Sequence, residues 1–273
     1  MDIDIKYALR ESIPIRLFAA PIKRRLLLKE LEKYSISEYP NRIKKYCRIH
    51  EGERCFIVGN GPSLCVEDIE RIANYPTFAS NSIFKIYPQT DWRPTYYLCV
   101  DPTYIDYHRE EIVKEVNSTK FISCRAEFPS GCNTERIFEY NKFKINKWND
   151  KSAFVKEDVS EYFSVGYTVT FTALQLAFYM GFKEIILIGV DFSYPIARNS
   201  KGKIVRTGIE NSVHFYKDNI KEQKYNVFNY EGALQAYKAA YDYAEKENIK
   251  IYDATRNGKL EVFKKIVLED CFA

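Results

Sequence analysis

The feature that most constrains the fold is a short apolar run that ends in a glycine-rich turn. Residues 55–58 are apolar, and the turn G-N-G-P-S follows at residues 59–63. A short apolar run that stops at glycine is typical of a buried β-strand, and helical spacing of apolar residues over 63–73 predicts a helix after it. This strand–turn–helix order is the repeating unit of α/β proteins.

The same alternation continues along the chain. Apolar runs predict further strands at residues 77–80, 95–100, 120–123, 183–189 and 249–252. Helical spacing predicts helices at 104–116, 168–180, 230–247 and 260–267, with Gly181 as a helix stop. The segment 127–158 is poorly periodic, and no element is predicted there. We therefore predict a Rossmann-like α/β fold with a mostly parallel sheet and helices on both faces.

Two regions fall outside this alternation. Residues 1–50 predict an amino-terminal helical extension to a Rossmann-like nucleotide-binding catalytic domain at 51–273. The long polar stretch at about 192–229 predicts a lid, because loops of that length in compact domains usually cover a binding site. The helix predicted at 21–34 is basic, so residues 16–29 are candidates for peripheral contact with an anionic membrane. Its apolar stripe equally predicts packing on the main domain or on a partner subunit, and two glutamates dilute its charge.

Composition narrows the class of protein. The hydrophobic fraction of 46% is ordinary for a globular chain, and the net charge of +4 does not predict nucleic-acid binding but suits an anionic nucleotide. Seven cysteines without a C-x-x-C pair and three scattered histidines predict reduced thiols and no metal site. No signal segment or membrane span is recognisable. We predict a cytoplasmic homo-oligomer, with peripheral contact at the inner face of the membrane as an alternative.

Polar residues follow several predicted strands at the point where each strand ends. The glycine turn follows the first strand, Asn81 the second, Asp101 the third, and Asp191 the strand at 183–189. Carboxyl ends of parallel strands share one edge of a sheet, so we expect a single nucleotide cleft there. Glycines let backbone approach a ligand, and a helix start attracts phosphate, with Ser63 as its expected cap. Each residue taken singly is also typical of a plain turn.

The predicted lid carries a candidate general base. His214 lies in the sequence N-S-V-H-F at 211–215, and histidine titrates near neutral pH. A histidine in a loop is also commonly a surface residue. The predicted lid also contains four basic residues: Arg198, Lys201, Lys203 and Arg206. They would close over the phosphates of a bound nucleotide if the loop is a lid, and would remain solvated if it is an ordinary surface loop.

Together these motifs resemble a known family. The sequences G-N-G-P-S-L at 59–64, G-F-K-E-I at 181–185 and G-V-D-F at 189–192 resemble the bacterial family 42 sialyltransferases. They equally resemble a wider Rossmann-like family named after archaeal 6-hydroxymethylpterin pyrophosphokinase, with members in surface-polysaccharide and flagellin glycosylation. The tail at 251–263 is similar to that wider family. The resemblance runs from about residue 55 to 263, without the segment 127–158.

The resemblance implies roles for individual residues. His214 matches the position of the general base, and Tyr194 is a candidate for holding phosphate as a second catalytic residue. Asp101 departs from the asparagine of the sialyltransferases and matches the wider family. The residues that the resemblance and the strand ends place at the nucleotide are Gly59, Asn60, Gly61, Ser63, Asn81, Asp101, Thr168 and Asp191.

Three functions are compatible with this pattern. The favoured one is an inverting glycosyltransferase that uses a CMP-activated, sialic acid-like or related acidic sugar for surface glycan or polysaccharide synthesis, without a cofactor. The alternative is Mg²⁺-dependent pyrophosphoryl transfer from ATP, in which Asp101 and Asp191 hold the metal. The third is a non-catalytic nucleotide-binding subunit of a polysaccharide assembly. The loop histidine and the basic amino-terminal helix favour the glycosyltransferase.

Overall fold

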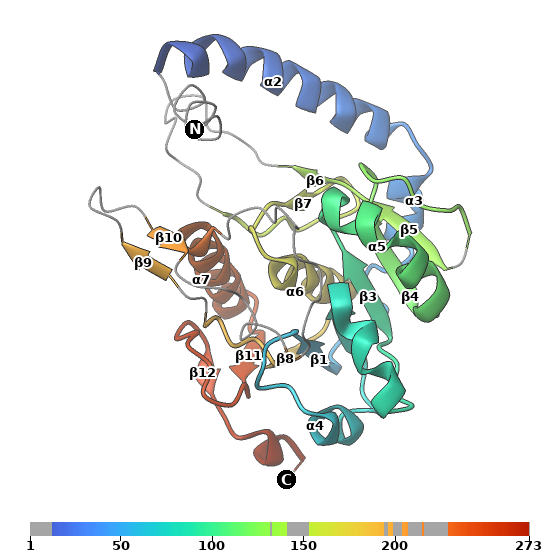
Figure 1. Cartoon of the computed structure of the whole chain (residues 1–273), viewed down its shortest axis with the longest axis vertical. Helices are drawn as coiled ribbons and strands as arrows, with labels where there is room; N and C mark the ends of the chain where they lie inside the picture. The colour runs from blue at the N-terminus through green and yellow to red at the C-terminus, as the bar shows by residue number, and fades with distance from the viewer. Residues whose placement is uncertain are drawn as a thin grey trace.

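A computed structural model describes residues 13–131, 133–140, 153–193, 196–198, 204–206, 215 and 229–272. Within them, eight strands form one sheet in the order β12-β11-β8-β1-β2-β3-β4-β5, and every pairing in it is parallel (Figure 1). This confirms the predicted Rossmann-like α/β fold. The strands are β1 (Arg54–Val58), β2 (Thr77–Ser80), β3 (Tyr96–Cys99), β4 (Thr119–Ser123), β5 (Thr134–Ile137), β8 (Glu184–Ile188), β11 (Lys250–Asp253) and β12 (Lys264–Lys265).

The remaining elements surround this sheet. Two short pairs lie outside it: β6 (Glu139–Tyr140) runs parallel to β7 (Phe163–Ser164), and β9 (Ile196–Arg198) is antiparallel to β10 (Ile204–Arg206). The 3₁₀ segments are η1 (Asn81–Gln89) and η2 (Leu268–Phe272). The described α-helices are α2 (Ile13–Ser35), α3 (Tyr39–Lys44), α4 (Val66–Arg71), α5 (Pro102–Glu115), α6 (Val169–Met180) and α7 (Tyr230–Lys246).

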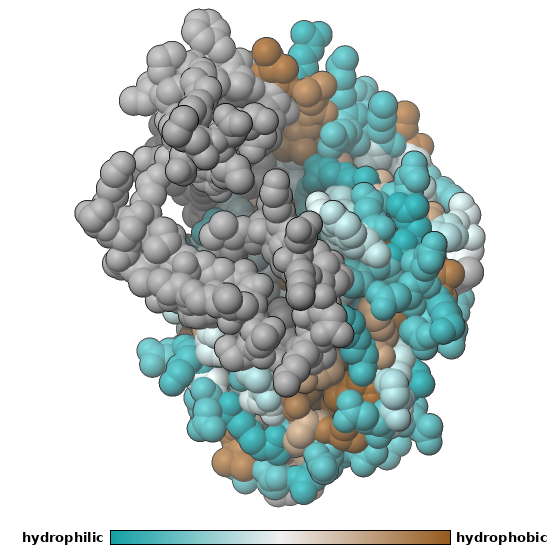
Figure 2. Space-filling model, in the orientation of Figure 1, coloured by the Kyte–Doolittle hydropathy of each residue, from teal (hydrophilic) through white to brown (hydrophobic). Residues whose placement is uncertain are grey.

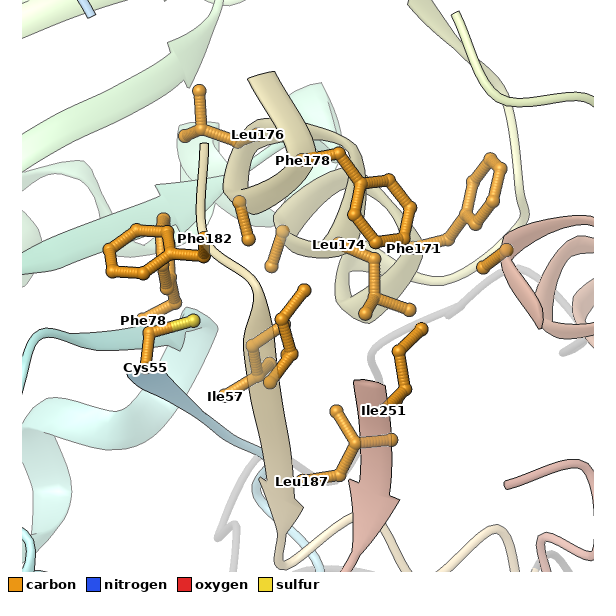
Figure 3. Packing of buried hydrophobic residues seen from close by; sticks show 14 of the residues in the cluster. Cys55, Ile57, Phe78, Phe171, Leu174, Leu176, Phe178, Phe182, Leu187 and Ile251 are labelled. Atoms are coloured by element: carbon orange, nitrogen blue, oxygen red, sulfur yellow. The ribbon is translucent and has the colours of Figure 1, made fainter. Parts of the chain in front are cut away.

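Hydrophobic cores cover both faces of the sheet. In β1, Cys55 and Ile57 join one buried cluster, whereas Phe56 and Val58 join the other, as expected from the alternation of side chains along a strand. The first cluster packs α6 and α7 on the sheet (Figure 3). The second packs α4, α5 and η1 on the opposite face. Helices on both faces explain why the strands read as nearly continuous apolar runs.

The strand order reverses beside β1. From β1 the chain builds outward through β2, β3, β4 and β5, and later returns to place β8 against the other side of β1. Val58 pairs with Ile188 at the ends of these two strands. The chain therefore leaves β1 and β8 toward opposite halves of the sheet, which opens the crevice where α/β proteins bind ligands.

Helix α6 is central to one face. Nine of its residues are buried, and it ends at Gly181, whose φ of +91° is the left-handed conformation predicted for a helix stop. Its fully buried Gln175 accepts a hydrogen bond from the Ser164 backbone N–H and donates one to the Ser164 carbonyl, both at 3.0 Å. These two bonds tie β7, and through it β6, to the helix.

The amino-terminal helices are partly integrated into the domain. Ile43 of α3 is fully buried in the main core, and Leu27, Leu31 and Tyr34 of α2 pack with Phe138. For these three residues of α2, the prediction that this helix packs on the main domain is therefore confirmed.

The rest of α2 is exposed. The side chains of Ile22 and Leu26 are 64% and 57% exposed. Figure 2 shows hydrophobic residues among hydrophilic ones along this outer helix. No helix in the described ranges is long and apolar enough to span a bilayer.

Three local expectations were wrong or incomplete. The helix predicted at 63–73 is shorter, spanning Val66–Arg71, because the G-N-G-P-S turn extends farther before the helix begins. The helix predicted at 260–267 is absent: Lys264–Lys265 instead pair with β11, and a 3₁₀ turn follows. The segment without a prediction contains β5 and β6, because two short, half-polar strands give too few alternating positions to recognise.

Candidate functional site

A cavity of about 480 Å³ opens at the carboxyl edge of the sheet, at the reversal point beside β1. It contacts the ends of β1, β2, β3 and β8 and the start of α6. Seven of the eight residues predicted at the nucleotide line it: Gly59, Asn60, Gly61, Asn81, Asp101, Thr168 and Asp191. The structure thus brings the predicted strand ends into one site, while their roles toward a ligand stay predictions.

The glycines of the first turn serve packing against a second turn. A Cβ on Gly59 would collide with the Gly189 carbonyl oxygen, and a Cβ on Gly61 would collide with the Asp191 carboxylate. Their N–H groups are also used within the protein: Gly59 donates to Ile188 at 2.8 Å and Gly61 to Gly189 at 2.9 Å. The sequence predicts that these glycines admit a phosphate. In the structure they interlock the turns after β1 and β8, and the approach of a phosphate to them stays a prediction.

Ser63 has a different position from the one expected. It lies beside the cavity, where its Oγ donates to Asp191 Oδ2 at 2.8 Å and its backbone N–H to Asp191 Oδ1 at 3.3 Å. The expectation that it caps the following helix is wrong, because Cys65 is the N-cap residue of α4. Burial raises the pKa of Asp191, and the Ser63 bonds oppose this rise. Ser63 therefore orients Asp191 toward the cavity.

Asn60 presents an unsatisfied acceptor. Its Nδ2 donates to the Ser80 carbonyl at 2.9 Å, which ties the first turn to the end of β2. Its Oδ1 is buried and has no hydrogen-bond partner among the described residues. Unpaired buried acceptors are rare because they cost about 1–3 kcal/mol each. A hydroxyl or amino group of a ligand would satisfy this atom.

Three residues that line the same cavity have a strained backbone conformation. Asn81, Tyr167 and Phe192 line it and all have positive φ, between +50° and +58°. Such angles are uncommon for residues other than glycine and are outliers for bulky side chains. Conformations of this kind persist where the surrounding structure imposes them, which is frequent at binding sites.

The amino terminus of α6 faces the cavity. Thr168, Val169 and Thr170 line it, and the Thr168 side chain makes no capping hydrogen bond. The first N–H groups of a helix carry partial positive charge and bind anions. Because no lysine or arginine lines the cavity within the described residues, α6 supplies the positive potential of this wall. This makes it a better phosphate site than the glycine turn, whose N–H groups are paired.

Asp101 is held by the helix that follows it. Its Oδ1 accepts from the backbone N–H groups of Thr103 at 2.9 Å and Tyr104 at 3.4 Å, which caps α5. Among the described residues, no three histidine, cysteine or acidic side chains are grouped to hold a metal ion. Both Asp191 oxygens accept hydrogen bonds from Ser63 and Asp101 Oδ1 caps α5, but each carboxylate keeps lone pairs, so the Mg²⁺ site at this pair stays a prediction.

Glu139 is a residue of the cavity that sequence reasoning missed. It lies on β6, half-buried, and its Oε1 accepts a hydrogen bond from Thr172 Oγ1 at 2.8 Å. Burial raises its pKa from 4.5 to about 7. No pattern in the segment 127–158 distinguishes this glutamate from its neighbours, because β6 is only two residues long.

The catalytic predictions lie outside the described residues. His214 and Tyr194 belong to this part, as do Lys201 and Lys203. Four described residues of the predicted lid reach the site: Phe192, Ser193 and Asn229 line the cavity, and the Phe215 backbone N–H donates to the Asn60 carbonyl at 3.0 Å. The residue that follows His214 in the sequence is therefore hydrogen-bonded to the first turn of the cavity.

Comparison with known families decides the chain's relationship. Residues 27–197 match the family described as 6-hydroxymethylpterin diphosphokinase MptE-like. The chain belongs to the MptE-like family. This confirms the wider of the two resemblances. The matched range of this MptE-like chain contains all the strand ends that line the cavity, from β1 to β8.

Two further comparisons complete the picture for this MptE-like chain. No curated protein sequence matches it. Among solved structures, the MAf glycosyltransferase from Magnetospirillum magneticum AMB-1 is similar at a TM-score of 0.45 and 14% sequence identity. That alignment covers 85% of this chain, which spans 38% of the length of the MAf chain.

Proposed function

We propose that this MptE-like protein is an inverting glycosyltransferase that uses a CMP-activated sugar, sialic acid-like or a related acidic sugar, in surface glycan or polysaccharide synthesis. The observation that carries the proposal is the single cavity that joins the G-N-G turn, Asn81, Thr168 and Asp191. The turn, Asn81 and Asp191 are positions at which the chain resembles the family 42 sialyltransferases, whereas residues 168–170 depart from their pattern. A site at the reversal point of a parallel sheet suits a nucleotide.

Different described residues bind different parts of the nucleotide. The α6 amino terminus faces the phosphate, because the positive end of a helix attracts an anion. The charged side chains in the described lining are three carboxylates, which do not. Asn60 Oδ1 accepts from the base or the ribose, and Asp191, held by Ser63, accepts from a ribose hydroxyl. The resemblance adds His214 as general base, Tyr194 at the phosphate and the lid cations above it. Charge that grows on the departing phosphate is stabilised by such fixed donors.

Pyrophosphoryl transfer from ATP is the second candidate, and the family name favours it. It requires a divalent cation between the phosphates. Asp101 and Asp191 both line the cavity and would hold this cation, whereas the glycosyltransferase needs none. The two candidates therefore differ in a property that a binding experiment can measure.

A thermal-shift screen with CMP, CDP, UDP, GDP and ATP, each with and without Mg²⁺, tests this proposal. Binding to the native state at a hundredfold excess over Kd stabilises it by about 2.7 kcal/mol, so CMP is expected to raise the Tm without Mg²⁺. Asn60→Ala should weaken CMP binding about tenfold by removing one hydrogen-bond acceptor. The exposed Asn74→Ala is the matched control.

The outcomes of the screen separate the candidates. A shift with ATP that strictly requires Mg²⁺, and none with CMP, would establish the diphosphokinase. Binding of CMP without turnover of any CMP-sugar would identify a non-catalytic subunit. If no nucleotide raises the Tm, the nucleotide site itself is wrong.

Contact of residues 16–29 with a membrane is a separate proposal. Exposed Ile22 and Leu26 stand beside exposed Arg24, Arg25 and Lys29, a combination that binds anionic lipid surfaces. We expect the protein to co-sediment with vesicles that contain phosphatidylserine but not with pure phosphatidylcholine. Leu26→Ser should weaken binding about tenfold or more by removing buried apolar area, whereas Ile36→Ser, which lies beyond the helix, should not. Equal recovery with both vesicles would contradict the proposal.

A further inference from the structure

Glu139 is the titratable side chain of the cavity that the family resemblance leaves without a role. It lines the same cavity as Asn60, Asp101 and Asp191, but comes from β6 on the side of α6. We infer that Glu139, in place of His214, is the catalytic base that takes the proton from the attacking acceptor hydroxyl. This inference rests on the proposed function, since it assigns the acceptor side of the same site.

The strand holds Glu139 toward the cavity. Its neighbours Phe138 and Tyr140 are 1% and 9% exposed and pack with Tyr34 of α2. Side chains alternate along a strand, so burying both neighbours on one side directs Glu139 to the other. The β6–β7 pairing and the Gln175 bonds to Ser164 fix this strand against α6. The position of the carboxylate is thus built into the fold.

A buried hydroxyl orients the carboxylate. Thr172 on α6 is fully buried, and its Oγ1 donates to Glu139 Oε1 at 2.8 Å. No described residue is hydrogen-bonded to Oε2, which leaves this oxygen to accept from a substrate. A base fixed at one oxygen and available at the other is the arrangement that proton transfer requires.

Burial and nearby charged groups together set the pKa of Glu139. Burial is the main cause that raises it to about 7; the Thr172 hydrogen bond and Arg125, which follows β4, lower it, and Asp101 at the start of α5 raises it. A general base is most effective when its pKa lies near the working pH. The environment therefore suits a group that is partly ionised at neutral pH.

The reaction balances with this base alone. The hydroxyl oxygen of the acceptor forms a bond to the anomeric carbon while its proton moves to Glu139 Oε2. The bond between the anomeric carbon and the phosphate oxygen breaks, and its electron pair leaves with CMP. Glu139 then returns the proton to water. The proposed function places the phosphate that gains charge at the α6 amino terminus, which stabilises an anion.

The first test measures the carboxyl group itself. Infrared difference spectra between the wild-type protein and Glu139→Gln, recorded across pH, isolate the Glu139 carboxyl. We expect it to titrate near pH 7. Titration below about pH 5, the range of an ordinary glutamate, would overturn the inference whether or not a substrate is known.

The second test measures turnover of CMP-N-acetylneuraminic acid, with water as the acceptor. Glu139→Gln is expected to lower kcat at least ~100-fold with little change in KM, and to remove the acid limb of the kcat profile. Glu139→Asp should restore part of the rate. Glu127→Gln, at a side chain that is 91% exposed, is the matched control and should behave as wild type.

Comparison with His214→Ala separates the two candidate bases. Glu139→Gln with unchanged kcat and an unchanged acid limb would overturn the inference and leave the proposed function standing. Absence of turnover and of CMP binding in the wild-type protein would overturn the proposed function and the catalytic role together. Thermal unfolding of Glu139→Gln shows whether this variant folds. Its side-chain amide keeps an oxygen that accepts from Thr172, so the variant should melt at or above the wild-type temperature at alkaline pH.

The sign of that stability change follows from the pKa. Because the folded state raises the pKa of Glu139 from 4.5 to about 7, it favours the protonated form. The resulting stability is fully present below pH 4.5 and is lost as pH rises through 7. Glu139→Gln removes this loss, so its advantage over wild type should grow between about pH 4.5 and 7 and stay constant above that range.

Discussion

Replacing Gly59 with alanine is expected to lower the free energy of unfolding by about 3 kcal/mol or more. The added Cβ would collide with the Gly189 carbonyl oxygen and lie 2.8 Å from the Gly189 carbonyl carbon and 3.1 Å from Val190 Cγ2. Relief requires β1 and β8 to separate, but five residue pairs hold these strands in register. The substitution should therefore break the Gly59–Ile188 hydrogen bond as well as strain the turn.

Denaturant unfolding of Gly59→Ala beside Gly52→Ala measures this effect. A Cβ on Gly52 meets nothing within 4 Å, although its φ is +83°. The control therefore isolates the backbone cost of a left-handed alanine, which is about 1–2 kcal/mol. A midpoint of Gly59→Ala equal to that of the wild type would show that the turns after β1 and β8 are not interlocked.

Asp253→Ala is the second substitution with a large expected effect, a loss of about 2–3 kcal/mol of stability. Asp253 is fully buried; its Oδ2 accepts from Lys265 Nζ at 2.6 Å and its Oδ1 from the Thr255 N–H at 2.9 Å. The Thr255 hydroxyl in turn accepts from the Val190 N–H at 3.1 Å. Removing the carboxylate therefore frees a chain of bonds that reaches the turn after β8.

An exposed ion pair provides the control for Asp253. Glu269 pairs with Arg71 at 2.5 Å, and both side chains are about half exposed. Ion pairs at the surface contribute only about 0–1 kcal/mol, so Glu269→Ala should change thermal unfolding little. The prediction is wrong if Asp253→Ala and Glu269→Ala melt at the same temperature. Loss of CMP binding in Asp253→Ala alone would show that the bond chain also supports the cavity.

The parts of the fold that sequence reasoning predicted share one property: their patterns are long or sharply bounded. The apolar strand at 183–189 and the helix that stops at Gly181 are recognisable because burial on both sheet faces leaves continuous apolar runs. From strand order alone it also follows that polar residues after these strands meet at one edge. Asn60, Asn81, Asp101 and Asp191 do so.

The parts that were missed depend on contacts between distant residues. Glu139 belongs to the site because Thr172 and the β6–β7 pair hold it there, and neither contact leaves a periodic signal in the sequence. The role of Gly59 and Gly61 depends on Gly189 and Asp191, more than 120 residues later in the chain. A glycine turn predicts close approach of backbone, but it does not reveal what approaches.

The interlocked turns have a consequence for how a ligand exchanges with solvent. Gly59, Gly61 and Ser63 bind the chain after β1 to the chain after β8 by four hydrogen bonds. The floor of the cavity is therefore one rigid block, and the two halves of the sheet cannot hinge apart at their junction. A ligand must therefore enter and leave through the mouth above this floor, without a separation of the two halves of the sheet.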